Sequence, residues 1–137
     1  MIWLFAVVIA IIAASLLFER WVDSRLFTAA PGQACANLGA AQAGSWLRDH
    51  PETQVLDVRS PAEFAGGALP HAVNIPLDDE SFAAKADALD RSRPVLVYCA
   101  GGFRSRKAIP ELKRLAFKNI LHLHRGYLSW RSVSGKA

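Results

Sequence analysis

The chain has 137 residues, 52% of them hydrophobic, with a net charge of +4 and two cysteines. This length accommodates one domain with a short attachment, and two cysteines exclude a disulfide-stabilised framework. Basic residues are concentrated after residue 90, but no aromatic residues alternate with them, so a nucleic-acid surface is not indicated.

The most apolar segment lies at the start of the chain. Residues 2–18 carry no charge, and as a helix they would be about 25 Å long, near the lower limit for crossing a bilayer. Trp3 and Trp21 stand at the two ends, where membrane helices place aromatic residues. We therefore predict a transmembrane anchor over 1–22 that contacts the membrane through residues 2–18.

Two other interpretations of this segment stay open. A cleaved signal peptide normally begins with positive residues, and none precedes the apolar run, although 27–34 contains small residues suited to cleavage. A buried core helix is the third possibility, but a helix that is apolar all round is hard to bury in so small a domain. Arg20 and Arg25 follow the helix, which favours a cytoplasmic domain over a periplasmic or secreted one.

After a predicted linker over 23–35, the patterns alternate between strand and helix. The expected elements are a helix at 38–50, a strand at 54–58, a helix from 60, a strand at 72–75, a helix at 81–89, a strand at 94–98, a helix at 105–117, a strand at 119–124 and a helical turn at 126–130. Such alternation predicts an α/β domain over 36–134 with a mainly parallel sheet, followed by a tail at 135–137.

One cysteine falls at the end of a fully apolar strand. Cys99 follows VLVY and precedes AGGFRS, a turn with two glycines that leads into a helix. Ligands bind at the carboxyl ends of parallel strands, and amide groups in a glycine-containing turn can face one anion. The start of the following helix directs further N–H groups to the same place, so the thiol is expected to ionise easily and act as a nucleophile.

Two chemistries use such a loop: phosphate-ester hydrolysis and sulfur transfer through a persulfide. A cysteine phosphatase has five residues between its cysteine and its arginine, whereas only four separate Cys99 from Arg104. The shorter loop suits a smaller guest, such as one additional sulfur atom.

At this point the ordered motifs resemble those of a single-domain rhodanese, a sulfurtransferase. VLDVRSPAEFAGGALPHAVNIPLDD at 55–79 resembles the upstream signature of the family, VLVYCAGGFRS at 95–105 its active-site strand and loop, and HRGYLSW at 124–130 its closing segment. The resemblance implies a rhodanese-like five-stranded, mainly parallel sheet flanked by helices, here preceded by one transmembrane helix. It also implies that Cys99 takes sulfane sulfur from a donor such as thiosulfate as a persulfide and passes it to cyanide or to a small-molecule or protein thiol.

The resemblance assigns roles to further residues. The loop expected to bind the persulfide consists of Ala100, Gly101, Gly102, Phe103, Arg104 and Ser105. Asp57, Arg59 and Glu63 are expected to form a supporting salt-bridged network. His71, His122 and His124 are interpreted as surface or core residues, because a preformed thiolate needs no base. No metal and no cofactor besides the covalent persulfide is expected, since the cysteines and histidines lack ligand spacing.

A function of another class also stays open, namely a membrane-tethered rhodanese-like binding module without turnover. The intact Cys99 argues against it, because binding-only versions often lose the nucleophile. Cys35 could resolve the persulfide into a disulfide, but its place in the predicted linker favours a bystander thiol.

Overall fold

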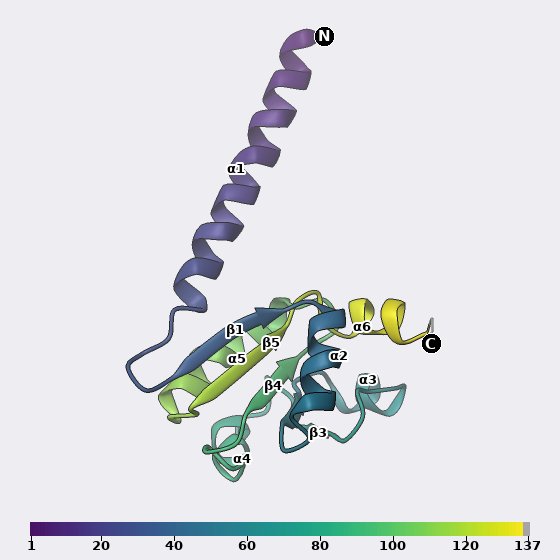
Figure 1. The fold of residues 1–137 in the computed structure, drawn as a ribbon. Coiled ribbons are helices and arrows are strands. Elements are labelled where there is room, and N and C mark those ends of the chain that lie inside the picture. Colours follow the sequence, from purple (N-terminus) through teal and green to yellow (C-terminus); the bar gives the residue numbers. More distant parts are fainter. Residues whose placement is uncertain (136–137) are drawn as a thin grey trace.

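A computed structural model describes residues 1–135 of the chain (Figure 1). Five parallel strands form one sheet in the order β1-β5-β4-β2-β3. The strands are β1 (Ala34–Leu38), β2 (Gln54–Asp57), β3 (Ala72–Asn74), β4 (Val95–Tyr98) and β5 (Asn119–Leu123), and each neighbouring pair is parallel. The helices are α1 (Ile2–Leu26), α2 (Ala40–Asp49), α3 (Pro61–Ala65), α4 (Phe82–Asp87), α5 (Phe103–Arg114) and α6 (Gly126–Ser134). The predicted α/β architecture is confirmed.

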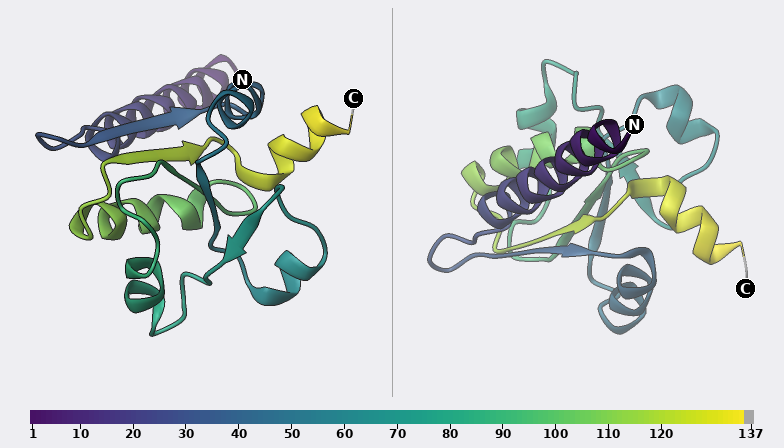
Figure 2. Two further views of the ribbon diagram at one scale, coloured as in Figure 1. Left: turned by 60° about the horizontal axis from the view of Figure 1, so that its bottom comes forward. Right: turned by 90° about the horizontal axis from the view of Figure 1, so that it is seen from above.

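The central strand β4 is buried on both faces because its side chains enter two cores alternately. Val95 and Val97 pack with α4 and α5, and Cys99 continues this row. Leu96 and Tyr98 pack with residues of α2 and α6. Figure 2 shows α5 (green) and α2 (blue) on opposite sides of the sheet. The apolar run therefore delivers Cys99 into the layer between the sheet and α5.

Helix α1 projects from the domain and leaves its apolar part uncovered (Figure 1). Its most apolar 18-residue window has a mean hydropathy of 2.5, and none of it is buried. Among the described residues it is the one helix long and apolar enough to cross a membrane, a property it shares with signal sequences. Its last turn contacts the domain: Asp23 forms an ion pair with Arg106 at 3.1 Å, and Leu26 packs against the core.

The structure corrects the predicted linker over 23–35. Helix α1 continues to Leu26, and β1 begins at Ala34, where it pairs with β5 along its whole length. The sequence ACANL has little intrinsic preference for a strand, so pairing with β5 decides its conformation. The helix predicted from residue 38 consequently begins at Ala40. Beyond Gly135, the predicted tail lies outside the described residues.

Helix α5 begins two residues earlier than predicted. It starts at Phe103, directly after Gly102, and continues through Pro110 without a break. Gly102 adopts φ +97°, a left-handed conformation that glycine tolerates and other residues resist. The catalytic loop suggested by the sequence is thus shorter than expected, and half of it is the first turn of a helix.

The first turn of α6 holds the backbone of that loop. Tyr127 N donates to Cys99 O at 2.8 Å, and Leu128 N donates to Ala100 O at 3.1 Å. Gly126, at φ +60°, lies against both carbonyl groups: a Cβ atom there would overlap the Cys99 oxygen and lie 2.7 Å from the Ala100 oxygen.

We expect Gly126→Ala to destabilise the protein by about 3 kcal/mol, because the methyl group overpacks this contact and disfavours the left-handed backbone. Urea unfolding of the full chain in detergent, followed by circular dichroism, measures the change. Gly44→Ala is the matched control: inside α2 the new methyl would lie 3.7 Å or more from other atoms, and alanine there should stabilise by about 0.5 to 1 kcal/mol. Equal effects of the two substitutions would contradict this account.

Candidate active site

Cys99 lies at the carboxyl end of β4 with 1% of its surface exposed. The amide of Gly102 donates to its Sγ at 3.1 Å, and the hydroxyl of Ser105 donates to the same atom at 3.3 Å. Both donors come from the start of α5, the element that follows the cysteine in the chain. The sulfur therefore faces the N-terminal end of a helix, where donor groups and the helix dipole favour negative charge.

These donors change the ionisation of the buried thiol. Burial by itself raises the pKa of Cys99, because a thiolate loses its hydration there. Hydrogen bonds from the Ser105 hydroxyl and from the amides of Ser105, Gly102 and Gly101 outweigh this effect, and the net pKa of Cys99 is lowered. The site can thus hold an anionic sulfur without any metal or neighbouring lysine.

Arg104 is held by Glu63 of α3. Its Nη1 and Nη2 donate to the two carboxylate oxygens at 2.8 and 2.7 Å, a bidentate pair. The same carboxylate accepts from Ser60 N at 3.0 Å and closes the capping box that starts α3. Arg104, followed by smaller contributions from Ser60, lowers the pKa of Glu63 to about 2. One carboxylate therefore joins α3 to the first turn of α5.

Asp57 and Arg59 form a buried ion pair, with Arg59 Nη2 2.7 Å from Asp57 Oδ2. The hydroxyl of Tyr98 donates to the same carboxylate oxygen at 2.6 Å, and Arg59 also donates to Gly67 O at 2.6 Å. Burial and then the bond to Asp57 raise the pKa of Tyr98. Within residues 1–135 no hydrogen bond joins the Asp57 or Arg59 side chain to the cysteine loop. This pair supports Tyr98, on the sheet face opposite Cys99.

A second group of polar residues lies on the Cys99 side, and it joins the predicted Ser105 to residues that were not predicted as part of the site. Ser105 Oγ lies 2.7 Å from Nε2 of His122, whose Nδ1 lies 2.9 Å from Asn37 Oδ1. Asn37 Nδ2 in turn lies 3.2 Å from Nδ1 of His124. His122 is fully buried, and burial is the main cause that lowers its pKa to about 4. A histidine between the leucines of the strand NILHL is the sequence signal that could have pointed to this position.

An opening adjoins the cysteine loop. A cavity of about 530 Å³ is lined by Gly101, Gly102 and Phe103 of the loop, by Leu128 of α6 and by Glu19 of α1, among others. Phe103 is 75% exposed there. The outer surface of the loop is therefore accessible to a reactant, although Cys99 itself is covered.

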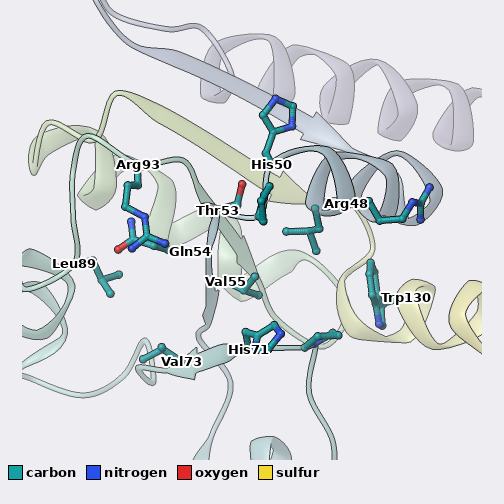
Figure 3. A pocket seen from close by; sticks show the side chains of 14 residues that line it. Arg48, His50, Thr53, Gln54, Val55, His71, Val73, Leu89, Arg93 and Trp130 are labelled. Carbon is teal, nitrogen blue, oxygen red and sulfur yellow. The ribbon is translucent and has the colours of Figure 1, made fainter.

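A larger cavity, of about 640 Å³, lies elsewhere (Figure 3). Its lining comes from α2, the starts of β2 and β3 and α6, and includes Arg48, His71 and Trp130. No residue of 99–105 lines it. Nothing in its lining connects it to the thiol.

Cys35 is remote from Cys99. The sheet register aligns Cys35 with Ile120 and Ile120 with Val95, so Cys99 lies about 13 Å further along the strand direction and two strand spacings, about 10 Å, across the sheet. A disulfide needs Cα atoms within about 7 Å. Burial raises the pKa of the Cys35 thiol, with a smaller opposing effect from Lys113. These placements favour the bystander interpretation of Cys35.

The comparisons with known proteins agree with this geometry. A protein from Allochromatium vinosum named sulfurtransferase is 30% identical over 84 residues, which cover 61% of this chain and 77% of the relative. A tRNA uridine(34) hydroxylase from Pectobacterium atrosepticum is 31% identical over 88 residues, and the chain spans about a quarter (25%) of its length. The crystal structure of a rhodanese-related protein from Thermoplasma volcanium matches with a TM-score of 0.63 at 30% identity, covering 72% of this chain and 92% of that one.

The profile of the family described as rhodanese-like domain matches residues 40–133, which include the cysteine loop and four of the five strands. The parallel sheet and the cysteine at the end of its central strand are in keeping with that match. The chain therefore belongs to the rhodanese-like domain family.

Proposed function

We propose that this chain is a membrane-anchored sulfurtransferase whose nucleophile is Cys99. The observation that carries the proposal is the pair of hydrogen bonds that Gly102 N–H and the Ser105 hydroxyl donate to the buried Cys99 sulfur, which help to lower the pKa of the thiol. The family and a relative named sulfurtransferase support it.

The reaction follows from a thiolate that faces several hydrogen-bond donors. The Cys99 thiolate attacks the outer sulfur of a donor such as thiosulfate; the S–S bond of the donor breaks, and sulfite leaves with the electron pair. The resulting persulfide carries its charge on the outer sulfur, which the amides of the loop stabilise without reorganisation. Cyanide or a thiolate then attacks that outer sulfur and regenerates the Cys99 thiolate. No external oxidant or reductant is consumed.

The state of Arg104 favours sulfur transfer over phosphate-ester hydrolysis. Both ends of its guanidinium group are engaged by Glu63, so it is not free to grip a tetrahedral phosphate in the loop. We propose that Arg104 fixes the first turn of α5 from outside, while the loop 100–105 supplies amides to the persulfide. The hydroxylase relatives do not extend the proposal to hydroxylation, because the match covers only about a quarter (25%) of their length.

The anchor interpretation of α1 is supported by the contacts of its last turn. A cleavage within 27–34 would remove Asp23, which pairs with Arg106, and Leu26, which packs against the core. A retained helix keeps these contacts and places residues 2–18 in the membrane. By the positive-inside rule, Arg20 and Arg25 favour a cytoplasmic domain.

The first prediction concerns turnover. The full chain in detergent should release thiocyanate from thiosulfate plus cyanide, and its intact mass should rise by about one sulfur atom before cyanide is added. Cys99→Ser should lose both signals, because serine has no sulfur atom with which to form a persulfide. If the folded wild-type chain gave neither signal with any of several sulfur donors, a tethered binding module would be favoured instead.

The second prediction concerns the support of the loop. Glu63→Gln removes the charge that orients Arg104, and we expect turnover to fall roughly ten-fold through misplacement of the first turn of α5. Glu111→Gln is the matched control, since Glu111 forms a comparable pair with Arg114 on the same helix but away from Cys99. Similar losses in the two variants would show that the Glu63 pair has no specific role.

The pH dependence of that pair provides a further check. The pKa of Glu63 is depressed from 4.5 to about 2 in the folded chain. The contribution of ionised Glu63 to the stability of the fold is therefore complete above the unfolded pKa of 4.5 and is lost as the pH falls through the folded pKa of about 2. We expect no step from Glu63 in the profile of wild-type turnover between about pH 5 and 8. A step there that Glu63→Gln abolishes would contradict the depressed pKa.

The last prediction of this section concerns the anchor. Retention predicts that the chain pellets with membranes after alkaline carbonate treatment and carries the intact mass of all 137 residues. A shorter, soluble chain that begins within 27–34 would identify α1 as a signal peptide. Protease accessibility of the domain in sealed vesicles of known orientation then gives the side of the membrane.

A further inference from the structure

The proposed sulfur-transfer mechanism makes no use of His122, although this residue is fully buried beside the active loop. A buried histidine normally has hydrogen-bond partners for both ring nitrogens. Here the partner of Nε2 is the hydroxyl of Ser105, which itself contacts the Cys99 sulfur. The partner of Nδ1 is the side chain of Asn37. The nucleophile, a bridging hydroxyl, an imidazole and an orienting amide thus form one chain.

The sheet register places these groups in line. Asn37 of β1 is aligned with His122 of β5, and His122 is aligned with Val97 of β4, two residues before Cys99. All four side chains point to the face covered by α5, and Ser105 of α5 contacts both Cys99 and His122 there. The arrangement is therefore a property of the sheet and helix pairing and does not depend on a flexible loop.

The same heavy-atom positions accommodate two arrangements of protons. In the first, the Cys99 S–H donates to Ser105 Oγ, the Ser105 O–H donates to Nε2 of a neutral His122, and Nδ1–H donates to Asn37 Oδ1. In the second, the S–H bond breaks and its proton passes to Ser105 Oγ, while the original Ser105 proton passes to Nε2. A thiolate and an imidazolium result, still bridged by the hydroxyl, and no proton leaves the site.

We propose that His122 is a positioning residue that takes the thiol proton of Cys99 through the Ser105 hydroxyl. In the second arrangement Ser105 donates to the sulfur, Nε2–H donates to Ser105 and Nδ1–H donates to Asn37, so each of these contacts has one donor and one acceptor. Asn37 fixes the ring orientation, as the third group of a nucleophile–base–orienter set does. Asn37 also donates to His124, which links the set to the edge of the loop cavity.

The surroundings of His122 set the balance between the two arrangements. Burial, Arg106 on α5 and His124 just after β5 all disfavour an imidazolium, and a backbone hydrogen bond at Gly102 has a smaller opposite effect. Asp23 of α1 partly offsets Arg106 by pairing with it, and the ring of Phe27 covers the imidazole with centroids 5.6 Å apart. The Cys99 thiolate is the negative group that can compensate the charge on His122. The protonated ring is therefore expected only while that thiolate is present.

The inference deepens the proposed function, but its test needs no sulfur donor. The alkylation rate of Cys99 by iodoacetamide reports its thiolate fraction, and peptide mass spectrometry separates Cys99 from Cys35. In the full chain in detergent, His122→Gln keeps a donor toward Ser105 but cannot accept a proton. We expect the midpoint of the alkylation profile to rise by about one pH unit, so that alkylation below both midpoints slows roughly ten-fold.

His71→Asn is the control. It removes an exposed histidine at φ +58°, a conformation that asparagine tolerates, and should leave the midpoint where it is. An unchanged midpoint in His122→Gln would reduce His122 to a packing residue and overturn the proposal. A lower midpoint in His122→Gln would also overturn the proposal. It would mean that His122 in the wild-type chain is neutral and accepts the Ser105 hydroxyl proton, so that this hydroxyl does not donate to the sulfur.

A second measurement leaves His122 in place. The ring carbon shifts of His122, followed by NMR against pH, should change together with ionisation of Cys99, and this coupled change should vanish in Cys99→Ser. Identical His122 titrations in the two proteins would overturn the proposal even if His122→Gln failed to fold. Coupled titration without thiocyanate release would instead reject sulfur transfer with the tested donors and leave the proton relay intact.

Discussion

The carboxyl edge of the sheet depends on one constraint: a sulfur atom that is buried in an apolar layer can carry charge only if hydrogen-bond donors surround it. Successive side chains of β4 point to opposite faces of the sheet, and this alternation directs Cys99 into the layer beneath α5, away from water. The donors can reach it because Gly102 adopts a left-handed backbone and α5 starts at the next residue. Ser105, in the first turn of that helix, then lies directly over the sulfur. The glycine, the helix start and the serine thus meet a single electrostatic requirement.

Two ion pairs support this arrangement, and burial makes their physical roles different. The Glu63–Arg104 pair is partly exposed, with side chains 36% and 42% accessible, so it contributes orientation more than stability. The Asp57–Arg59 pair is almost inaccessible and shares its carboxylate with Tyr98. Loss of one partner there would leave an uncompensated charge in the core. The first pair secures the outside of the loop, and the second secures the strand that leads to it.

The central features of the fold followed from local patterns. The apolar run before Cys99 predicted strand β4, which is buried on both faces, and the pattern from residue 60 predicted helix α3, which begins with a capping box. Strand β1 could not be predicted in this way, because ACANL has no alternating pattern and acquires its conformation from pairing with β5. Asn37 was missed with it. His122 was noticed but assigned no role, since its neighbours Ser105 and Asn37 come from distant segments that only the tertiary structure brings together.

Helix α1 runs unbroken from Ile2 to Leu26 and is fastened to α5 through Asp23 and Arg106. With residues 2–18 in a bilayer, eight further helical residues form a stalk about 12 Å long. In the proposed anchored state, the contacts of Asp23 and Leu26 with the domain would restrict how the domain is oriented relative to the lipid surface. Glu19, one residue beyond the apolar segment, lines the same cavity as Gly101 and Phe103. If the proposed anchor holds, this cavity beside the cysteine loop would open close to the headgroups, within reach of reaction partners that diffuse in the plane of the membrane.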